Sequence, residues 1–391
     1  MKIAYVNKTR WLSNMPSTVF SFMNAYSFAQ NGHETTAIFK EKNVDIEQSY
    51  SEYFDVEALS IFKVKTFRDK YLLIRSNESF YLNVNKYLSH EENRPDLILT
   101  RDPGYLPFLI KLKNKYRVKA FYQTHNFYLD PNIRDDFDSV NQKKYTKYEN
   151  KFIPMLDGVL ALNVPHKELY EKYTDVPVYA GKPGLKKVQE PLDNFNKRII
   201  LYSGSFQLKK GLDILLEALK KLKDIDFKLV LAGGRNKNEI DLMKTLLKEY
   251  GLEEKSEITG WLSYSQLEKR IREAAVGIIP LKETFYNRYL TAPSKLFDYL
   301  SFGVPVVASG LPSIEELIGE YDCGELFYPV DADNLSDSIG KILESRDLYE
   351  KYSRNSNLAA KDYLWQKRAA DMIEFMRSEE RRVGKECIVK C

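Results

Sequence analysis

Two turns in the second half of the chain combine residues that suit phosphate binding. In the segment SGSFQLKKG, residues 203–211, Gly204 allows a tight backbone turn, and Lys209 and Lys210 add two positive charges where a helix is predicted to begin. Amide groups at the start of a helix lack partners within the helix, so they attract anions. This combination predicts a site for a pyrophosphate group, whereas an ordinary turn with solvated lysines is the alternative.

The second turn lies in LTAPSKLFDYLSFGVPVVAS, residues 290–309. Pro293 and Ser294 fit the start of a helix, and Lys295 places a positive charge in its first turn. Asp298 follows one turn later, and its carboxylate can accept hydrogen bonds from the two neighbouring hydroxyl groups of a ribose. The alternative role for Asp298 is solvation of the helix surface.

Polar residues in the first half also follow predicted buried strands. Arg101 and Asp102 follow DLILT, residues 96–100, and His125 follows KAFYQT, residues 119–124. Ligands of parallel sheets bind beyond the carboxyl ends of the strands, so these three side chains are candidates for a second substrate site. A local ion pair between Arg101 and Asp102 and a structural role for His125 are the alternatives.

The elements that would position these residues alternate between strands and helices. Strands separated by helix-length segments indicate parallel sheets that are covered on both faces. We therefore predict an α/β protein with two Rossmann-like domains at residues 1–185 and 186–360 whose parallel sheets face each other across a cleft. The hydrophobic pattern predicts strands over residues 2–6, 35–39, 96–100, 119–124, 158–162, 199–203, 228–232, 256–259, 276–280 and 304–309, an interdomain connection over 177–198, and helices over 16–30, 211–223, 237–250, 263–275 and 294–302.

The end of the chain divides into two parts. Residues 361–376 predict a helix, and we expect it to pack back on the N-terminal domain. Residues 377–391 contain RSEERRVGKEC, which resembles the conceptual translation of a common short-read sequencing adapter. We interpret this tail as non-native and exclude it from the prediction of the fold. An ordinary charged terminus is the alternative.

Composition excludes several classes of protein. A length of 391 residues with 43% hydrophobic residues fits two folded domains and excludes a small binding module. The net charge of +4 is too small for a nucleic-acid binder. The three cysteines, Cys323, Cys387 and Cys391, are too few for a disulfide framework or a four-ligand zinc site. The apolar stretches are shorter than a bilayer span and the amino terminus lacks a secretory pattern, so we expect a cytoplasmic protein.

The order of motifs in the second half resembles the donor domain of retaining GT-B glycosyltransferases of family 4. NGHE at 31–34 and THN at 124–126 fit the acceptor domain of the same family. The resemblance implies that a hexose moves from a UDP- or GDP-linked sugar to a carbohydrate or lipid-linked acceptor, with retained configuration, in a surface-polysaccharide or glycolipid pathway. The donor motifs are SGSFQLKKG, LVLAGG at 229–234, ITGW at 258–261, VGIIPL at 276–281, APSKLFDYLSFGVPVVAS at 292–309 and ELIGEYDCGELF at 316–327.

The resemblance also assigns roles to single residues. It places Lys210 on the donor diphosphate, Asp298 on the nucleotide ribose, and His125 opposite the transferred sugar and the acceptor, and we take these three as the catalytic set. The donor site that it implies consists of Gly204, Ser205, Lys209, Lys210, Gly234, Trp261, Pro293, Ser294, Lys295 and Asp298, and the acceptor side consists of Ser17, Arg101, Asp102 and His125.

Three positions depart from the family pattern. Leu290 stands where the first glutamate of the E-x7-E pattern is expected, Ser205 replaces a phosphate-binding arginine, and SNMPS at 13–17 replaces a glycine pair. Two alternatives stay open: a GT-B nucleotide-sugar epimerase, and a nucleotide-sugar-binding subunit without catalysis, which the missing glutamate and Ser205 make plausible. A Rossmann dehydrogenase is disfavoured because no GxGxxG follows the first strand.

Two further patterns bear on metals and membranes. Asp-x-Asp triplets occur at 136–138, 224–226 and 331–333, but the third fits a helix entry and the others lie in charged surface stretches. We expect no metal and no other cofactor, because lysines and helix starts can neutralise a departing diphosphate. A basic run follows an apolar segment and fits either the end of a helix or peripheral contact with anionic lipid at the inner face of the membrane. The run consists of Lys111, Lys113, Lys115, Arg117 and Lys119.

Overall fold

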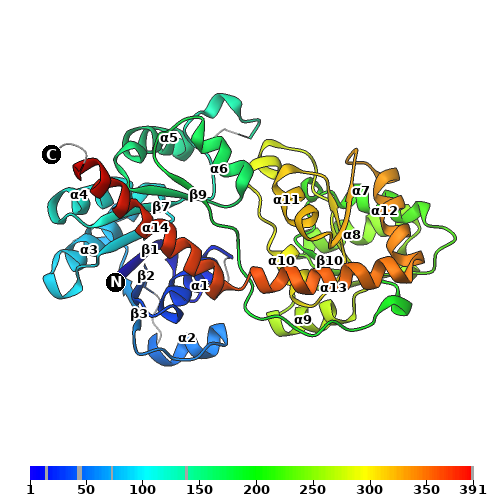
Figure 1. Cartoon of the computed structure of the whole chain (residues 1–391). Coiled ribbons are helices and arrows are strands. Elements are labelled where there is room, and N and C mark those ends of the chain that lie inside the picture. Colours follow the sequence, from blue (N-terminus) through cyan, green and yellow to red (C-terminus); the bar gives the residue numbers. More distant parts are fainter. Residues whose placement is uncertain (14–15, 42–45, 72–73, 137–139, 389–391) are drawn as a thin grey trace. The chain divides into compact units, whose positions relative to one another are not determined.

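The structure, a computed structural model, describes residues 1–13, 16–41, 46–71, 74–136 and 140–388. The chain divides into two compact units. Unit 1 comprises Met1–Lys182 together with Trp365–Cys391, and unit 2 comprises Pro183–Leu364 (Figure 1). The chain therefore leaves the first unit slightly before residue 185 and returns to it at Trp365.

Unit 1 contains a seven-stranded sheet in the order β3-β2-β1-β6-β7-β8-β9, and every pairing in it is parallel. The central strand β6 is buried along its length, as expected for a strand covered on both faces. The strands are β1 (Lys2–Arg10), β2 (Glu34–Lys40), β3 (Phe62–Phe67), β6 (Leu97–Thr100), β7 (Lys119–Gln123), β8 (Gly158–Ala161) and β9 (Val178–Ala180), and a separate antiparallel pair is formed by β4 (Lys70–Tyr71) and β5 (Ile74–Arg75).

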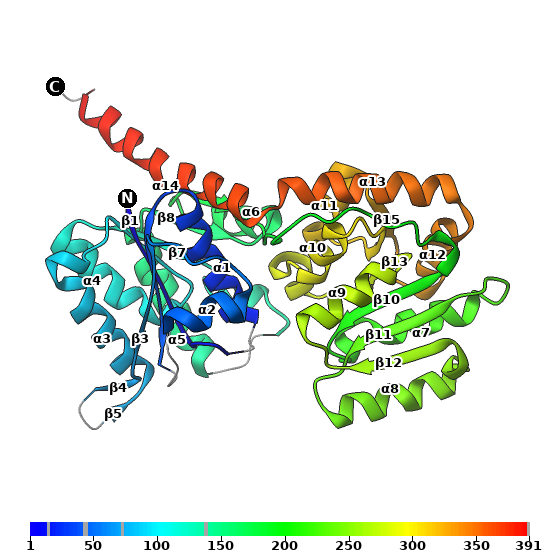
Figure 2. The same cartoon turned by 90° about the horizontal axis from the view of Figure 1, so that it is seen from below.

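The helices of unit 1 include one from the far end of the chain. Helix α14 packs on α1 (Figure 2). The rings of Phe20 and Trp365 lie 5.4 Å apart, and the Asn31 side-chain amide donates to the Gln366 carbonyl at 2.9 Å. Ten residues of α1 are buried, so this helix lacks a wide polar face. The helices are α1 (Pro16–Gln30), α2 (Ile46–Phe54), α3 (Asn77–Ser89), α4 (Leu106–Tyr116), α5 (Val140–Phe152), α6 (Val164–Glu171) and α14 (Trp365–Ile388).

Unit 2 contains a six-stranded parallel sheet in the order β12-β11-β10-β13-β14-β15. Helix α7 buries the leucine stripe at 212, 215, 216 and 219 against this sheet. The elements are β10 (Ile199–Gly204), α7 (Leu212–Lys221), β11 (Lys228–Gly233), α8 (Lys237–Tyr250), β12 (Ser256–Gly260), α9 (Tyr264–Glu273), β13 (Val276–Ile279), α10 (Ser294–Ser301), β14 (Val306–Ser309), α11 (Pro312–Tyr321), β15 (Gly324–Phe327), α12 (Ala332–Glu344) and α13 (Arg346–Asp362).

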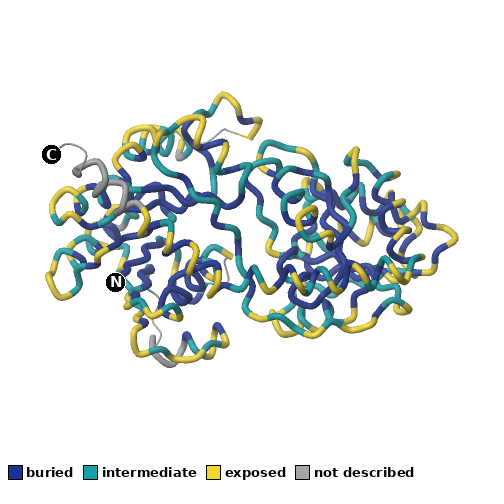
Figure 3. Tube along the Cα trace, in the orientation of Figure 1, coloured by how far each residue is buried: buried dark blue, intermediate teal, exposed yellow. Residues whose placement is uncertain are grey.

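Buried residues concentrate along the strands of each unit (Figure 3). Strands β13 and β14 are buried at every position because helices cover both faces of the sheet. The prediction of an α/β protein with two Rossmann-like, parallel-sheet domains is confirmed. Within the described residues, no helix has both the length and the apolar composition that a bilayer span requires.

Two predicted segments differ from the structure. The connection expected over residues 177–198 contains β9, an edge strand of three residues that is too short to give a hydrophobic pattern. The helix expected over 361–376 is interrupted, because α13 ends before Tyr363 and α14 begins at Trp365. Between these two helices the chain pairs with the segment around Leu185, which follows β9. There the Leu185 amide donates to the Tyr363 carbonyl at 2.8 Å.

Candidate active site

Glycine residues allow the backbones of β10 and β11 to lie in close contact at the carboxyl ends of these strands. The Gly234 amide donates to the Gly204 carbonyl at 3.3 Å, and Gly204 adopts a φ of +130°. A Cβ on Gly233 would lie 1.7 Å from the same carbonyl oxygen, so only glycine fits there. The sequence thus needs these glycines to form a narrow turn at the end of the sheet.

The lysines of the same turn differ in exposure. A short helical turn, η6 (Leu208–Lys210), leads to Gly211, where an added Cβ would clash with the Pro280 carbonyl oxygen at 1.6 Å. Lys209 is exposed, whereas Lys210 is half-buried. Burial, together with the charges of Lys209 and Arg235, lowers the pKa of the Lys210 ammonium. Three cations therefore lie close together at this turn.

Lys295 on α10 joins the same group. Its ammonium nitrogen lies 3.7 Å from the centroid of the Tyr202 ring and would be 3.5 Å from a Cβ on Gly204. Burial and the charge of Lys210 lower the pKa of Lys295 to about 7. Pro293 and Ser294 begin α10, and Pro293 provides no side-chain cap for the first amide groups of this helix. The structure thus brings the two predicted phosphate-binding turns together.

Asp298 lies one turn further along α10. The Tyr264 hydroxyl donates to its carboxylate at 3.4 Å. Burial raises the pKa of Asp298 to about 7, although the hydrogen bond from Tyr264 opposes this shift. Trp261 follows β12 and is 59% exposed, which leaves its indole ring available to a ligand. Ser205 is buried and uses its carbonyl oxygen to accept from the Tyr202 hydroxyl at 2.9 Å.

The sequence analysis missed three residues of this group: Tyr202, Arg235 and Tyr264. Arg235 directly follows LVLAGG, so its place after β11 could have identified it. No local sequence pattern marks the two tyrosines, because they join the group only through contacts with side chains of α10. The described residues provide no ion-pair partner for Lys210, Arg235 or Lys295.

In unit 1, Asp102 is bonded within the protein. Its buried carboxylate accepts from the Lys8 ammonium at 3.0 Å, from the Gly104 amide at 3.0 Å and from the Tyr81 hydroxyl. The ion pair of Asp102 is formed with Lys8, which sequence analysis missed, and not with Arg101, the partner considered as an alternative. The Arg101 guanidinium lies over the Phe20 ring at 4.2 Å, and Ser17 is half-buried in the first turn of α1.

His125 is half-buried after β7, next to the strand that precedes Arg101 and Asp102. Burial, followed by the charges of Arg101, Lys8 and His166, lowers the pKa of His125 well below its usual value. The imidazole is therefore neutral at physiological pH. Its Nδ1 atom is buried without a hydrogen-bond partner among the described residues.

Residues of two Asp-x-Asp triplets and one lysine of the basic run have local partners. Asp331 caps α12 by accepting from the Asn334 amide at 2.9 Å, as predicted for a helix entry. Asp136 pairs with Arg134, and Asp138 lies outside the described residues. In the basic run, Lys113 pairs with Asp157 at 2.8 Å near the end of α4, whereas Lys111, Lys115 and Arg117 are exposed.

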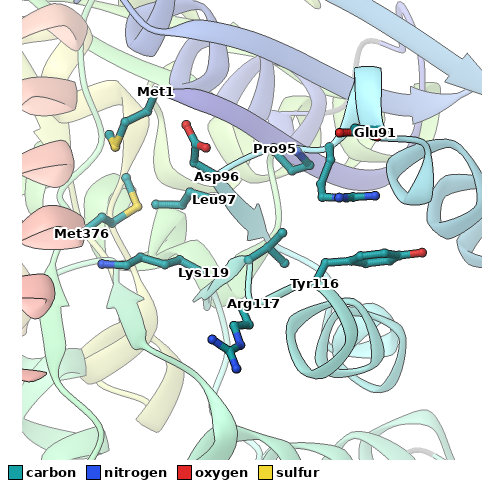
Figure 4. Close-up of a pocket in the computed structure, with 11 residues that line it drawn as sticks. Met1, Glu91, Pro95, Asp96, Leu97, Tyr116, Arg117, Lys119 and Met376 are labelled. Atoms are coloured by element: carbon teal, nitrogen blue, oxygen red, sulfur yellow. The ribbon is translucent and has the colours of Figure 1, made fainter.

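A cavity of about 410 Å³ lies at the opposite edge of the unit 1 sheet. Figure 4 shows Met1, Asp96 and Lys119, which stand at the amino ends of β1, β6 and β7, together with Met376 of α14. The predicted acceptor residues follow the carboxyl ends of these strands, and none of them lines this cavity.

Comparison with known proteins identifies the second half of the chain. Residues 186–358 match the family described as glycosyl transferases group 1. An uncharacterized glycosyltransferase of Methanocaldococcus jannaschii is 27% identical over 171 residues, which are 40% of this chain and 42% of that protein. The MMP alpha-(1->4)-mannosyltransferase of Mycolicibacterium hassiacum is 26% identical over 192 residues, 48% of this chain and 44% of that protein. The chain thus matches less than half the length of these curated relatives.

Solved structures resemble the chain over nearly its full length. Sucrose-phosphate synthase from Thermosynechococcus elongatus has a TM-score of 0.73 and 16% identity, covering 96% of this chain and 98% of that one. Anabaena HepE in complex with UDP has a TM-score of 0.73 and 15% identity, covering 97% and 100%. At this identity the likeness establishes the GT-B fold. The match to the glycosyl transferases group 1 family covers residues 186–358, which is less than half of this chain, and the solved structures add the fold of the rest.

Proposed function

We propose that the protein is a retaining glycosyltransferase of family 4. It transfers a hexose from a UDP- or GDP-linked sugar to a carbohydrate or lipid-linked acceptor, in surface-polysaccharide or glycolipid biosynthesis. The observation that carries this proposal is the group of Lys210, Arg235 and Lys295 around the Gly204 turn, without an ion-pair partner among the described residues. Cations kept together in this way favour a doubly charged ligand.

Unit 2 would stabilise the leaving group. When the bond between the anomeric carbon and the diphosphate oxygen breaks, its electron pair stays on the diphosphate. Lys210 and Lys295 neutralise this developing charge, which is the main task of the protein in such a reaction. A bound diphosphate would also raise the pKa of Lys295 from about 7 and keep it charged. Asp298 accepts from the ribose hydroxyl groups, and the exposed ring of Trp261 contacts the nucleotide.

Unit 1 would bind the acceptor. The acceptor oxygen forms the new bond to the anomeric carbon, and the neutral imidazole of His125 accepts a hydrogen bond from the acceptor hydroxyl. Arg101 and Lys8 lie close enough to His125 to lower its pKa, so they also favour an electron-rich acceptor group nearby. Ser17 and Asp102 complete this side of the site in our proposal.

The relatives support the class of donor. One matched relative is named a mannosyltransferase, and one structural neighbour was solved with UDP. Both names fit a nucleotide-linked hexose as the substrate of this chain.

A screen of nucleoside diphosphates by thermal shift tests the proposal. We expect UDP or GDP to raise the melting temperature, and we expect transfer from the matching sugar nucleotide to depend on His125 and Asp298. Epimerised donor in the absence of an acceptor would instead support the epimerase. Tight binding without turnover, unchanged in the His125→Ala and Asp298→Ala variants, would support a binding subunit.

We also propose peripheral membrane contact through α4, where Lys111, Lys115 and Arg117 are exposed. Cosedimentation with liposomes that contain anionic lipid tests this contact, with the triple glutamine variant as the comparison. Equal binding of the two proteins would remove the membrane from the proposal.

A further inference from the structure

A buried carboxyl group lies behind the loop that carries His125. Glu149 on α5 is fully buried, and its carboxyl oxygens accept from the Tyr122 hydroxyl and the Tyr128 amide, each at 3.0 Å. The Tyr170 hydroxyl of α6 lies 3.0 Å from both carboxyl oxygens. Glu149 therefore contacts β7, the His125 loop and α6 at the same time.

The same network holds the residue that follows His125. The Asn126 carbonyl oxygen lies 3.1 Å from the Tyr170 hydroxyl and 3.1 Å from Nε2 of His166, and it accepts from the Thr124 hydroxyl at 2.5 Å. The Leu162 amide donates to Nδ1 of His166 at 3.3 Å, so the proton of this ring sits on Nε2 and points to Asn126. The backbone on both sides of His125 is thus anchored.

The single proton of the Tyr170 hydroxyl can reach either Glu149 or Asn126, while the Thr124 hydroxyl, which lies 3.0 Å from the Tyr170 oxygen, directs its own proton to the Asn126 carbonyl. An ionised carboxylate only accepts hydrogen bonds, so the Tyr170 hydroxyl would donate its hydrogen bond to ionised Glu149. A protonated carboxyl group can donate to the Tyr170 oxygen, and Tyr170 then donates to the Asn126 carbonyl. The protonation state of Glu149 therefore determines whether the Tyr170 hydroxyl donates to the Asn126 carbonyl of the loop or to Glu149.

The groups that face Glu149 determine when it carries this proton. They are Tyr122 from β7, Tyr128 from the loop, Tyr170 from α6 and, through its charge, Arg134. Burial outweighs their hydrogen bonds and the charge of Arg134 and raises the pKa of Glu149 to about 8. His166, which also contacts Asn126, stays neutral because burial lowers its pKa to about 3.

We propose that Glu149 is a positioning residue for His125. Its protonated carboxyl group holds the loop at 124–128 through Tyr170, and loss of that proton in mildly alkaline solution transfers the Tyr170 hydrogen bond away from Asn126. The inference rests on the proposed role of His125 in transfer, but the contacts that carry it lie within unit 1 and need no substrate.

Labelling of the histidines with nitrogen-15 tests the structural part directly, because the chain has four of them. Neither His125 nor His166 titrates above neutral pH, so a change in their ring shifts there reports a neighbouring group. We expect a step in the His166 shifts centred near pH 8. The step should vanish in Glu149→Gln, which keeps the size of the side chain and stays neutral, and should persist in Glu171→Gln, an exposed residue of α6. A step that survives in Glu149→Gln, or its absence from the wild type, would overturn the proposal.

Kinetics test the link to transfer. The wild-type kcat should fall by about two- to tenfold as the pH rises through 8, the loss expected for one hydrogen bond. Glu149→Gln should remove this fall without changing the affinity for UDP or GDP. If that variant does not fold, Tyr170→Phe should suppress the His166 step while the carboxyl group remains. A wild type without transferase activity would refute the proposed function and leave the shift experiment valid, whereas an active enzyme without the step would refute only the role of Glu149.

Discussion

In unit 1 Asp102 and Arg368 are hydrogen-bonded within the protein, whereas in unit 2 Lys210, Arg235 and Lys295 form no ion pair with any described residue. Asp102 has three donors in unit 1, and Arg368 of α14 donates to the Asn24 side chain at 2.5 Å and to the Gly181 carbonyl at 2.7 Å. In unit 2, burial and the charge of Lys210 instead lower the pKa of Lys295, and burial with the charges of Lys209 and Arg235 lowers the pKa of Lys210.

This difference separates two uses of charge. A buried charge with satisfied hydrogen bonds fixes the fold, and its removal leaves its partners unsatisfied. Cations that repel one another reduce the stability of the free protein and gain their partner when an anion binds. Substitutions in unit 1 should therefore alter stability, whereas substitutions of these lysines should alter binding.

The largest effect is expected for Arg368→Ala. This substitution leaves the Asn24 and Gly181 oxygens without their buried donor, so we expect the free energy of unfolding to fall by about 2 to 4 kcal/mol. Arg354→Ala is the matched control, because Arg354 is 67% exposed and its contact with Glu350 is 3.8 Å long, and it should change stability by less than about 0.5 kcal/mol. Urea unfolding measures both, and equal effects of the two substitutions would contradict the comparison.

Lys210→Ala should weaken diphosphate binding. It removes one or more charge-assisted contacts, worth about 1.5 to 3 kcal/mol, so the Kd for UDP or GDP should rise by about ten- to hundredfold. The exposed neighbour provides the control, since Lys209→Ala should have a smaller effect. Titration calorimetry measures the Kd, and the stability without nucleotide should not fall, because the substitution removes a repelling charge. Equal affinity of Lys210→Ala and the wild type would refute the assigned role.

The contribution of Lys295 should depend on pH. In the free protein its pKa is lowered to about 7, so the ammonium is charged below that pH and becomes neutral as the pH rises. An anion binds the charged form, so the contribution of Lys295 is present below pH 7 and declines above it. The ratio of the Kd of Lys295→Met to that of the wild type should reach about tenfold at pH 6 and approach one at pH 9. A ratio that is constant with pH would show that Lys295 does not contact the diphosphate.

The smallest effect is expected for Tyr264→Phe. The substitution removes the hydrogen bond to Asp298, which is long at 3.4 Å, and should weaken nucleoside binding by about two- to tenfold. The Kd values of uridine and of inorganic pyrophosphate, measured separately, show which part of the site loses affinity. We expect only uridine to bind more weakly, because only uridine carries a ribose. Reduced affinity for pyrophosphate would place Tyr264 elsewhere in the site.

The elements predicted from the sequence are those with the most continuous apolar pattern. Strands such as β10 and β13 lie inside a sheet covered on both faces, so nearly all their side chains are buried and apolar. The edge strands β3, β9 and β15 have mixed burial, and the first and last of these combine apolar with polar residues. Their strand character comes from pairing with a neighbour, which a local pattern does not record.

Local sequence patterns are limited in the same way for the candidate active site, because they do not record contacts between distant segments. Gly204 and Lys210 could be predicted because a strand-to-helix turn needs glycine and presents its lysines locally. Lys8 pairs with Asp102 across 94 positions in the sequence, and the contacts of Glu149 come from three separate elements. Single-sequence reasoning identifies residues that turn the chain at a sheet edge, but not those that meet only after folding.

The return of α14 to unit 1 has a consequence for synthesis of the protein. Trp365, Met372 and Met376 belong to a core that also contains Phe22 and Phe121 from the first third of the chain. Residues Pro183–Leu364 are synthesised before α14, so unit 2 is complete while unit 1 still exposes the apolar side chains that α14 will cover. A nascent chain that stops before Trp365 would expose these side chains permanently, as a target for chaperones and proteases.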